Sequence, residues 1–309
     1  MKQKKSLAIL ISLILAVSLF TGCSPGEGPV PSGSATEPAS SPSASITESN
    51  ADPEDQSITI TDMTGREVTL AEPASRIVAL TPSDCEILFA IGAGEGLVGR
   101  GEYCNYPEAV LEVPAVQSGA NTNLEQIIDL APQVLLMSTM AQSKEQVATL
   151  EAAGIQVVVS DADDIEGVYT AISMIGTLMG KFDQAQALID SMKASFLSVS
   201  AKADEWAGKS IYFEVSPLEW GLWTAGSSTF MDEIARMIGL DNIFADVEGW
   251  AEVSEEQVLA RDPDYILTIS MYFGEGPKPV EEILGRTGWE NVSAVKNMAL
   301  LNLPNDELS

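Results

Sequence analysis

The sequence predicts an α/β protein in which two parallel-sheet lobes are joined by a single long, rigid α-helix. Three observations lead to this prediction. Apolar segments of strand length alternate with helical segments from Ile58 onwards, as in parallel sheets that carry helices on both faces. A pair of short motifs occurs twice, in the same order. Between the two copies lies a stretch without proline, residues 133–216, that contains a long amphipathic helix.

Local signals delimit the elements of the first half of the chain. Three apolar segments are short enough to be buried strands: residues 77–80, 134–137 and 156–159. A capping-box pattern, in which Ser is followed three residues later by Glu or Gln, begins at Ser83 and again at Ser143. The two patterns predict helices over residues 83–91 and 143–153, each ended by a glycine.

The repeat is the most informative internal feature. Residues 125–136 match residues 256–267: each segment reads as a short helix, a proline that ends it, and a buried strand. A second pair, residues 86–92 and 233–239, shares Glu-Ile at its start and Ile-Gly at its end. Because both pairs keep the same order, they predict two related lobes. The alternative is two similar βα units within one sheet.

Two helices are predicted between the repeats. Residues 165–179 form the first, and residues 184–206 form the second, with Asp183 as its N-cap. The second carries one apolar stripe at spacings of three and four residues: Leu188, Met192, Phe196, Val199 and Ala203. At 1.5 Å per residue it would be about 35 Å long. Such a helix would form a stiff bridge between the lobes, so large hinge closure is not expected.

The first residues of the chain form an export signal. Lys2, Lys4 and Lys5 precede an apolar run of 14 residues that ends in Phe20-Thr-Gly-Cys23. This pattern resembles the lipobox of bacterial lipoproteins, which implies a signal peptide over residues 1–22 and lipidation of Cys23. The alternative is an ordinary signal peptide followed by a chance cysteine.

The remaining chain divides into four predicted regions. Cys23 and the Ser- and Pro-rich residues after it form a disordered tether, residues 23–57, because they offer almost no apolar surface to bury. The folded part comprises an N-terminal lobe, a linking helix and a C-terminal lobe: residues 58–182, 183–207 and 208–309.

Composition excludes several classes of function. The chain has 16 Lys and Arg against 45 Asp and Glu, a net charge of −29, and no histidine. This charge argues against nucleic acid or an anionic membrane surface as a partner. Without histidine, neither Ser-His-Asp nor Cys-His catalysis is available, nor any metal site that depends on imidazole. We therefore predict no catalytic residues, no protein-bound metal and no cofactor.

Several motifs in sequence order resemble the iron-siderophore and cobalamin substrate-binding lipoproteins of ABC importers. The likeness begins with Asp62-Met-Thr-Gly-Arg66-Glu-Val and extends from Ile58 to about Leu303. The segments that carry it further are residues 75–83, 86–92, 123–127, 223–226, 242–246 and 253–257. The resemblance implies two α/β lobes joined by one rigid helix, the class III arrangement, with the ligand between the lobes. Family members usually continue into a final helix, so the C-terminal lobe is expected to be truncated or capped differently.

The resemblance also implies that one exposed glutamate in each lobe docks on arginines of the membrane permease. Glu125 and Glu256 occupy those positions, and both belong to the repeat. Two carboxylates on matching short helices could each accept bidentate arginine contacts, which would set the orientation of the complex. The alternative is that each is simply an acid in the first turn of a helix, where the helix dipole favours it.

The ligand is expected to contact aromatic side chains in the cleft: Tyr103, Tyr106, Trp220, Trp223 and Trp250. Flat rings suit a large, partly apolar ligand such as a corrin or a siderophore shell. The segment from Tyr103 to Pro107, together with Trp250, is more similar to cobalamin binders, and the scarcity of basic residues disfavours anionic ferric catecholates. The alternative for each ring is burial in a lobe core, which we expect for Trp289.

Cys85 and Cys104 are expected near the cleft edge of the first lobe. A disulfide between them is allowed outside the cytoplasm. Free thiols, or soft ligands to a bound metal, are the alternatives.

Together these features predict an extracytoplasmic, monomeric protein that is lipid-anchored to the cell membrane. It would capture a cobalamin-like corrinoid and deliver it to an ABC permease and its ATPase. The first alternative is a ferric hydroxamate siderophore as ligand. More remote alternatives are a secreted carboxylate-based enzyme that uses Asp161, Asp163 and Asp164, and a surface adhesin or structural lipoprotein.

Overall fold

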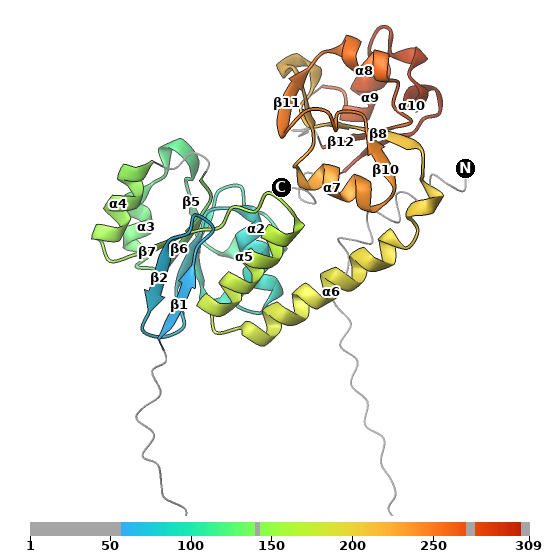
Figure 1. Cartoon of the computed structure of the whole chain (residues 1–309). Helices are drawn as coiled ribbons and strands as arrows, with labels where there is room; N and C mark the ends of the chain where they lie inside the picture. Colours follow the sequence, from blue (N-terminus) through green and yellow to red (C-terminus); the bar gives the residue numbers. More distant parts are fainter. Residues whose placement is uncertain (1–56, 140–142, 270–275, 304–309) are drawn as a thin grey trace, which may run out of the picture.

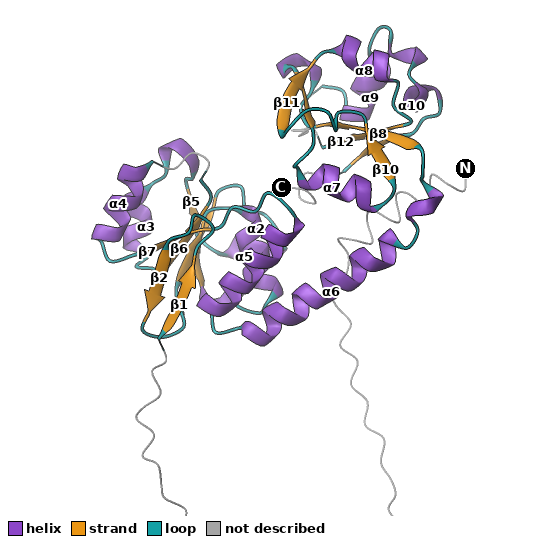
Figure 2. Ribbon diagram, in the orientation of Figure 1, coloured by secondary structure: helices purple, strands orange, loops and turns teal. Residues whose placement is uncertain are grey.

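The computed structural model describes residues 57–139, 143–269 and 276–303. The predicted signal peptide, Cys23 and all but the last residue of the predicted tether lie outside the described residues. The described chain forms two lobes, and one long helix, α6, runs between them (Figures 1 and 2). The prediction of two α/β lobes joined by a single helix is confirmed.

Lobe one contains a five-stranded parallel sheet of order β5-β4-β3-β6-β7. Its strands are β3 (Ile77–Ala79), β4 (Leu97–Gly101), β5 (Ala115–Val116), β6 (Val134–Met137) and β7 (Gln156–Val159). Its helices are α2 (Pro82–Ala90), α3 (Leu124–Asp129), α4 (Lys144–Ala152) and α5 (Ile165–Leu178). An antiparallel hairpin of β1 (Ile58–Thr61) and β2 (Glu67–Leu70) precedes them.

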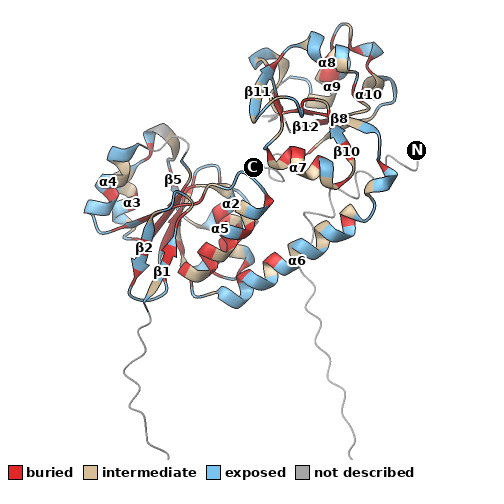
Figure 3. Ribbon diagram, viewed as in Figure 1, coloured by how far each residue is buried: buried red, intermediate tan, exposed pale blue. Residues whose placement is uncertain are grey.

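Alternation along the strands divides the core of lobe one between the two faces of the sheet. Ile77 and Ala79 pack with α2, α5 and the hairpin, whereas Val78 between them packs with α3 and α4. Successive side chains of a strand point to opposite faces, so strands that are apolar throughout require helices on both. Figure 3 shows the buried positions concentrated on the strands and on the helix faces turned towards them.

Lobe two repeats this plan with a four-stranded parallel sheet of order β10-β8-β12-β13. Its strands are β8 (Lys209–Glu214), β10 (Leu240–Asn242), β12 (Tyr265–Thr268) and β13 (Leu300–Asn302). Its helices are α7 (Phe230–Met237), α8 (Glu255–Arg261), α9 (Pro279–Gly285) and α10 (Ser293–Lys296). A separate antiparallel pair, β9 (Leu222–Ala225) and β11 (Trp250–Val253), completes the lobe.

The topology confirms the internal repeat. In lobe one, β3 is followed by α2 and β4, and later by α3, β6, α4 and β7. In lobe two, β8, α7 and β10, then α8, β12, α9 and β13, occur in the same order. The strands also take corresponding places in the sheets, β4-β3-β6-β7 and β10-β8-β12-β13. The alternative of two βα units within one sheet is therefore wrong.

The linking helix differs from the prediction at both ends. Helix α6 spans Phe182–Ser200, so it is about 29 Å long, and Lys181 rather than Asp183 occupies the N-cap position. The helix was expected to continue to Trp206. Instead the chain turns through a short 3₁₀ segment, Ala203–Glu205. This turn lets Trp206 enter the core of lobe two, where its ring meets Tyr265 edge-on at 5.7 Å.

Helix starts were predicted correctly at one of the two capping-box patterns. Ser143 and Gln146 form the expected reciprocal bonds at the start of α4. At α2, by contrast, the helix begins at Pro82 and the N-cap position belongs to Thr81, not Ser83. Proline has a preset φ and no N–H to leave unsatisfied, so it favours the first helical position. This preference moves the N-cap two residues earlier, from Ser83 to Thr81.

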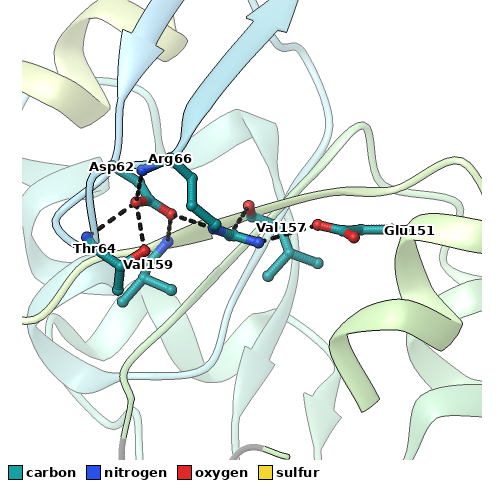
Figure 4. Close-up of polar contacts among 6 residues, drawn as sticks. All are labelled: Asp62, Thr64, Arg66, Glu151, Val157 and Val159. Atoms are coloured by element: carbon teal, nitrogen blue, oxygen red, sulfur yellow. Dashed lines mark hydrogen bonds and ion pairs between the residues drawn. The ribbon is translucent and has the colours of Figure 1, made fainter. Parts of the chain in front are cut away.

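Asp62 fixes the β1–β2 hairpin to the sheet of lobe one (Figure 4). Its carboxylate accepts hydrogen bonds from the backbone N–H groups of Thr64 and Arg66 at 2.9 Å, and from the hydroxyl of Thr64 at 2.7 Å. The guanidinium of Arg66 also donates to Asp62 and to the carbonyl oxygen of Val157 in β7. Burial opposes ionisation, but these donors outweigh it and hold the pKa of Asp62 below its usual value. The resemblance motif at residues 62–68 is thus a structural clamp.

Candidate functional site

All five aromatic side chains predicted to contact the ligand lie at the surface. Their exposed fractions are 73% for Tyr103, 51% for Tyr106, 62% for Trp220, 40% for Trp223 and 48% for Trp250. Burial in a lobe core is therefore wrong for each of them. Trp289 is fully buried in lobe two, as expected. Exposed apolar side chains that form a contiguous patch indicate a binding surface, so the arrangement of these rings decides their role.

Two of the tryptophans share one face of the β9–β11 pair. Trp223 lies directly opposite Glu252, and Trp250 lies opposite Ala225, in the antiparallel register. Trp223 and Trp250 are therefore diagonal neighbours, with their backbones about 7–8 Å apart and their side chains on the same side. The other face of the pair is buried through Leu222 and Val253. We call the exposed face, with Trp223 and Trp250, the tryptophan platform.

One aromatic ring contacts the platform, and another lies in the turn that leads into it. Phe230, at the start of α7, meets Trp250 edge-on with ring centroids 6.3 Å apart. Trp220 ends the short 3₁₀ turn that leads into β9. Ser216 holds this turn in place because its hydroxyl accepts from the backbone N–H of Trp223 at 3.0 Å. The platform is thus a supported aromatic surface rather than a set of isolated rings.

The two tyrosines lie on the loop that follows β4 in lobe one. Arg100 Nη1 donates to the carbonyl oxygens of Gly101 and Cys104, at 3.1 and 2.9 Å, and so holds the loop in a tight turn. Gly101 is required here, since a Cβ at this position would lie 2.2 Å from the carbonyl oxygen of Leu80. The repeat places this loop after β4 just as it places the β11 segment after β10. Aromatic residues therefore follow the same strand in each lobe.

Charge near the platform is negative. Glu219, Glu248 and Glu252 are exposed within the segments that build it. In lobe one, the guanidinium of Arg100 is already bonded to loop carbonyl groups. A surface with aromatic faces and acidic neighbours favours a neutral or cationic ligand over an anionic one.

Glu125 and Glu256 occupy equivalent positions on two short helices. Each is the second residue of its helix, α3 or α8, and each side chain is exposed. Asn123 and Ser254 cap these helices by accepting from the backbone N–H groups of Gln126 and Gln257. The backbone N–H of Glu256 and the Ser254 side chain lower the pKa of Glu256, so this carboxylate is charged at neutral pH. The fold thus presents, in each lobe, one exposed glutamate in the first turn of a capped short helix.

Two of the three acids proposed for a secreted enzyme accept hydrogen bonds from the backbone. Asp164 is the N-cap of α5 and accepts from the backbone N–H of Gly167 at 2.7 Å. Asp161 accepts from the backbone N–H of Thr139 at 3.1 Å. Asp163 is exposed to solvent. Within the described segments, no group of three or more Cys, Asp or Glu side chains is arranged to hold a metal ion.

Cys85 and Cys104 are both fully buried in the core of lobe one. Their thiols are free and contact each other. Apolar neighbours from α2 and β3 surround them, which explains the burial.

Sequence reasoning missed two polar contacts between distant residues. Arg286 makes a bidentate ion pair with Glu214 at 2.7 and 2.9 Å, and both side chains are almost fully buried. Glu233 in lobe two accepts a hydrogen bond at 3.0 Å from the backbone N–H of Ile165, the first residue of α5 in lobe one. Neither pair has a local spacing signal, because the partners lie 72 and 68 residues apart.

The sequence model of the periplasmic binding protein family matches residues 77–307. The chain belongs to this family, and the likeness to ABC-importer substrate-binding proteins is confirmed. It is 32% identical over 310 residues to YvrC of Bacillus subtilis, an uncharacterized ABC transporter substrate-binding lipoprotein, with 98% of this chain and 91% of that protein covered. It is 29% identical over 200 residues to the vitamin B12-binding protein of Salmonella choleraesuis, covering 63% of this chain and 72% of that protein.

Solved structures share the fold. One of them is described as a possible iron-binding (periplasmic solute-binding) protein of Staphylococcus epidermidis. It is 28% identical with a TM-score of 0.62, and the match covers 77% of this chain and 92% of that one. The vitamin B12-binding protein BtuF of Vibrio cholerae is 25% identical with a TM-score of 0.63, covering 76% and 89%. A heme-binding protein of Vibrio cholerae, HutB, shares the fold at 23% identity, with a TM-score of 0.69 and coverage of 75% and 91%.

Among the residues that the structure describes, no helix is both long and apolar enough to cross a membrane.

Proposed function

We propose that this protein is an extracytoplasmic, lipid-anchored substrate-binding protein that captures a cobalamin-like corrinoid and delivers it to an ABC permease. The tryptophan platform carries the proposal. Two tryptophans on one face of a supported β-pair offer a flat stacking surface suited to the apolar part of a macrocycle. The acidic neighbours Glu219, Glu248 and Glu252 favour a ligand without net negative charge.

Charge and ligation separate a corrinoid from heme. Heme carries two propionates, which the acidic neighbours of the platform would repel. The chain also lacks histidine, the most frequent axial ligand for heme iron in proteins. A corrinoid whose side chains end in amides places no carboxylate near these acids. A ferric hydroxamate siderophore of low net charge is the alternative ligand. No bond is made or broken in this function.

Ligand titration tests the proposal. The purified protein is titrated with cyanocobalamin, cobinamide, hemin and a ferric hydroxamate, and binding is followed by tryptophan fluorescence and calorimetry. We expect tight binding of a corrinoid and weak or absent binding of hemin. Failure of both corrinoids to bind at micromolar concentrations would exclude the proposed ligand, and binding of the hydroxamate alone would establish the alternative.

Substitutions of the platform locate the site. Trp223→Ala and Trp250→Ala are each expected to weaken corrinoid binding about tenfold, the effect of losing roughly 1.4 kcal/mol of stacking. Phe182→Ala is the matched control, because Phe182 is an exposed aromatic residue on α6, outside the platform. Its removal should leave the affinity unchanged. An equal loss in all three variants would place the ligand elsewhere.

Glu125 and Glu256 are proposed to dock on arginines of the permease. Their equivalent positions at the starts of α3 and α8 support this role, since two fixed carboxylates would set the orientation of the complex. The double variant Glu125→Arg with Glu256→Arg should retain ligand affinity and lose ligand uptake by cells. Glu145→Arg, which changes an exposed acid in the first turn of α4, is the control and should import normally. Normal uptake by the double variant contradicts the docking role.

Lipidation of Cys23 is proposed to hold the protein at the membrane, with residues 23–57 as a tether. The tether would carry the two lobes, residues 58–182 and 208–309, and the linking region between them, residues 183–207. A single substitution, Cys23→Ala, should move the protein from the membrane fraction to the soluble extracytoplasmic fraction. Retention of the variant in the membrane fraction would show that another segment anchors the chain.

A further inference from the structure

Two thiols meet in the core of lobe one. Cys85 lies in the first turns of α2, and Cys104 lies in the loop after β4. Both side chains are fully buried in the same apolar cluster, and a hydrogen bond links the two thiols. The Cys85 thiol also reaches the carbonyl oxygen of Ala79 at 3.7 Å. No other cysteine lies among the described residues.

The backbone around Cys104 is held in place against α2 and β3. Its N–H donates to the carbonyl oxygen of Gly101 at 3.1 Å, and its own carbonyl oxygen accepts from Arg100 Nη1 at 2.9 Å. Gly101 lets this loop approach Leu80 more closely than any side chain would permit. The contact between the thiols is therefore a consequence of the fold rather than of one mobile side chain.

We propose that Cys85 and Cys104 form a disulfide that crosslinks helix α2 to the loop carrying Tyr103 and Tyr106. The crosslink goes beyond ligand capture and rests on the proposed export only for its supply of oxidant. If the two tyrosines contact the ligand, it also fixes part of the binding surface. The closed loop would span residues 85–104, and closure of such a loop restricts the unfolded chain.

The reaction consumes a disulfide oxidant, either a small molecule or a thiol oxidoreductase. The thiolate of one cysteine attacks the oxidant and forms a mixed disulfide, releasing one thiol. The other cysteine then loses its proton and attacks the sulfur of the first, releasing the second thiol. Two thiols are oxidised and one disulfide is reduced to two thiols.

Burial sets the time at which this reaction can occur. In the folded lobe neither sulfur is exposed, so an oxidant can reach them only before α2 and the loop pack together. The link should form during folding and then resist reduction in the native protein.

Peptide mapping tests the crosslink on the full chain extracted from membranes. The protein is unfolded in N-ethylmaleimide without reductant and digested with trypsin. Cleavage after Arg76, Arg100 and Lys144 places Cys85 in peptide 77–100 and Cys104 in peptide 101–144. We expect these two peptides to be joined, and to separate after reduction. Recovery of both peptides with one maleimide each would overturn the proposal.

The same digest separates failure of export from failure of the crosslink. Lipidated Cys23 leaves no free thiol, whereas an unexported chain yields peptide 6–66 with a maleimide on Cys23. In that case the chain is refolded with oxidised and reduced glutathione, and the digest is repeated. Joined peptides 77–100 and 101–144 then support the crosslink, and maleimide on both cysteines excludes it.

Thermal unfolding provides a second readout. Reduction should lower the melting temperature of the wild-type chain by roughly 5–10 °C. The variants Cys85→Ala, Cys104→Ala and the double variant should show no dependence on reductant. If wild type and double variant respond equally to reductant, the thiols are not linked.

Discussion

Asp84 is a fully buried carboxyl group in the first turn of α2. The hydroxyl groups of Thr81 and Ser160 bond to the carboxyl group, but its Oδ1 atom has no hydrogen-bond partner among the described residues. Burial therefore raises the pKa of Asp84 to about 6, against the opposing effect of the two hydroxyl groups. This residue is charged at neutral pH in surroundings that favour its neutral form.

Neutralising Asp84 should stabilise the protein in a pH-dependent way. The folded-state pKa lies above the unfolded value of 3.8, so the folded chain holds the proton more tightly and loses stability as the pH rises from about 4 to about 6. We expect Asp84→Asn to increase the free energy of unfolding by about 1–3 kcal/mol at pH 7.5, with little effect at pH 4. Urea unfolding at both pH values measures this. Asp163→Asn, at an exposed acid, is the control, and an equal effect of Asp84→Asn at both pH values contradicts the prediction.

At the scale of the element, Arg286 joins β8 to α9. It pairs with Glu214 at the end of β8 and with Glu282 in α9, and its guanidinium stacks over Trp289 at 4.5 Å. Each buried charge is thus compensated by hydrogen bonds and by an opposite charge. A buried pair of this kind is weak evidence for added stability, but removal of one partner leaves an isolated charge.

Arg286→Met should therefore destabilise lobe two strongly. We expect a loss of about 3–5 kcal/mol, because Glu214 would remain buried without a partner. The double variant Glu214→Leu with Arg286→Met should recover much of that loss, since no fully buried charge remains and Glu282 is partly exposed to water. Urea unfolding of both variants gives the comparison. If the double variant is as unstable as the single one, packing around Arg286 rather than its charge is decisive.

At the scale of the whole molecule, α7 of lobe two contacts lobe one directly. Glu233 accepts from the backbone N–H of Ile165 at the start of α5, where the helix dipole favours a negative charge. Ile234 and Met237 on the same helix pack against the core of lobe one. The separation of the lobes therefore depends on this contact as well as on α6.

Loss of the Glu233 carboxylate should loosen the lobes while leaving each folded. For Glu233→Ala we expect faster hydrogen exchange at Ile165, a destabilisation of about 1 kcal/mol and a larger radius of gyration in X-ray scattering. Asp164→Ala is the matched control, because it removes the N-cap of the same helix from within lobe one. It should also weaken α5 but leave the radius unchanged. An identical radius for Glu233→Ala and wild type would show that α6 alone sets the separation.

Local patterns in the sequence were sufficient for much of the fold. The strands at residues 134–137 and 156–159, the α4 capping box and the two repeated helix–proline–strand units all depend on neighbours within a few residues. Helix ends were less predictable. The apolar stripe of α6 continues past Ser200, but the packing of Trp206 into lobe two ends the helix there.

For the candidate site, residue type predicted the aromatic and acidic positions but not how they are arranged. That Trp223 and Trp250 share a face follows from the register of two strands separated along the chain. The contact between Cys85 and Cys104 depends on the close approach of Gly101 to Leu80.

The sequence alone determined that the chain is a duplicated α/β protein, because the spacing of apolar and capping residues acts through local backbone geometry. The resemblance to a known family, rather than spacing, singled out Glu125 and Glu256. Only the tertiary structure decided which distant groups meet: Glu214 with Arg286, Glu233 with Ile165, and the two thiols of lobe one. These contacts form when the lobes close on themselves and on each other, and pairings across such separations leave no periodic trace in the chain.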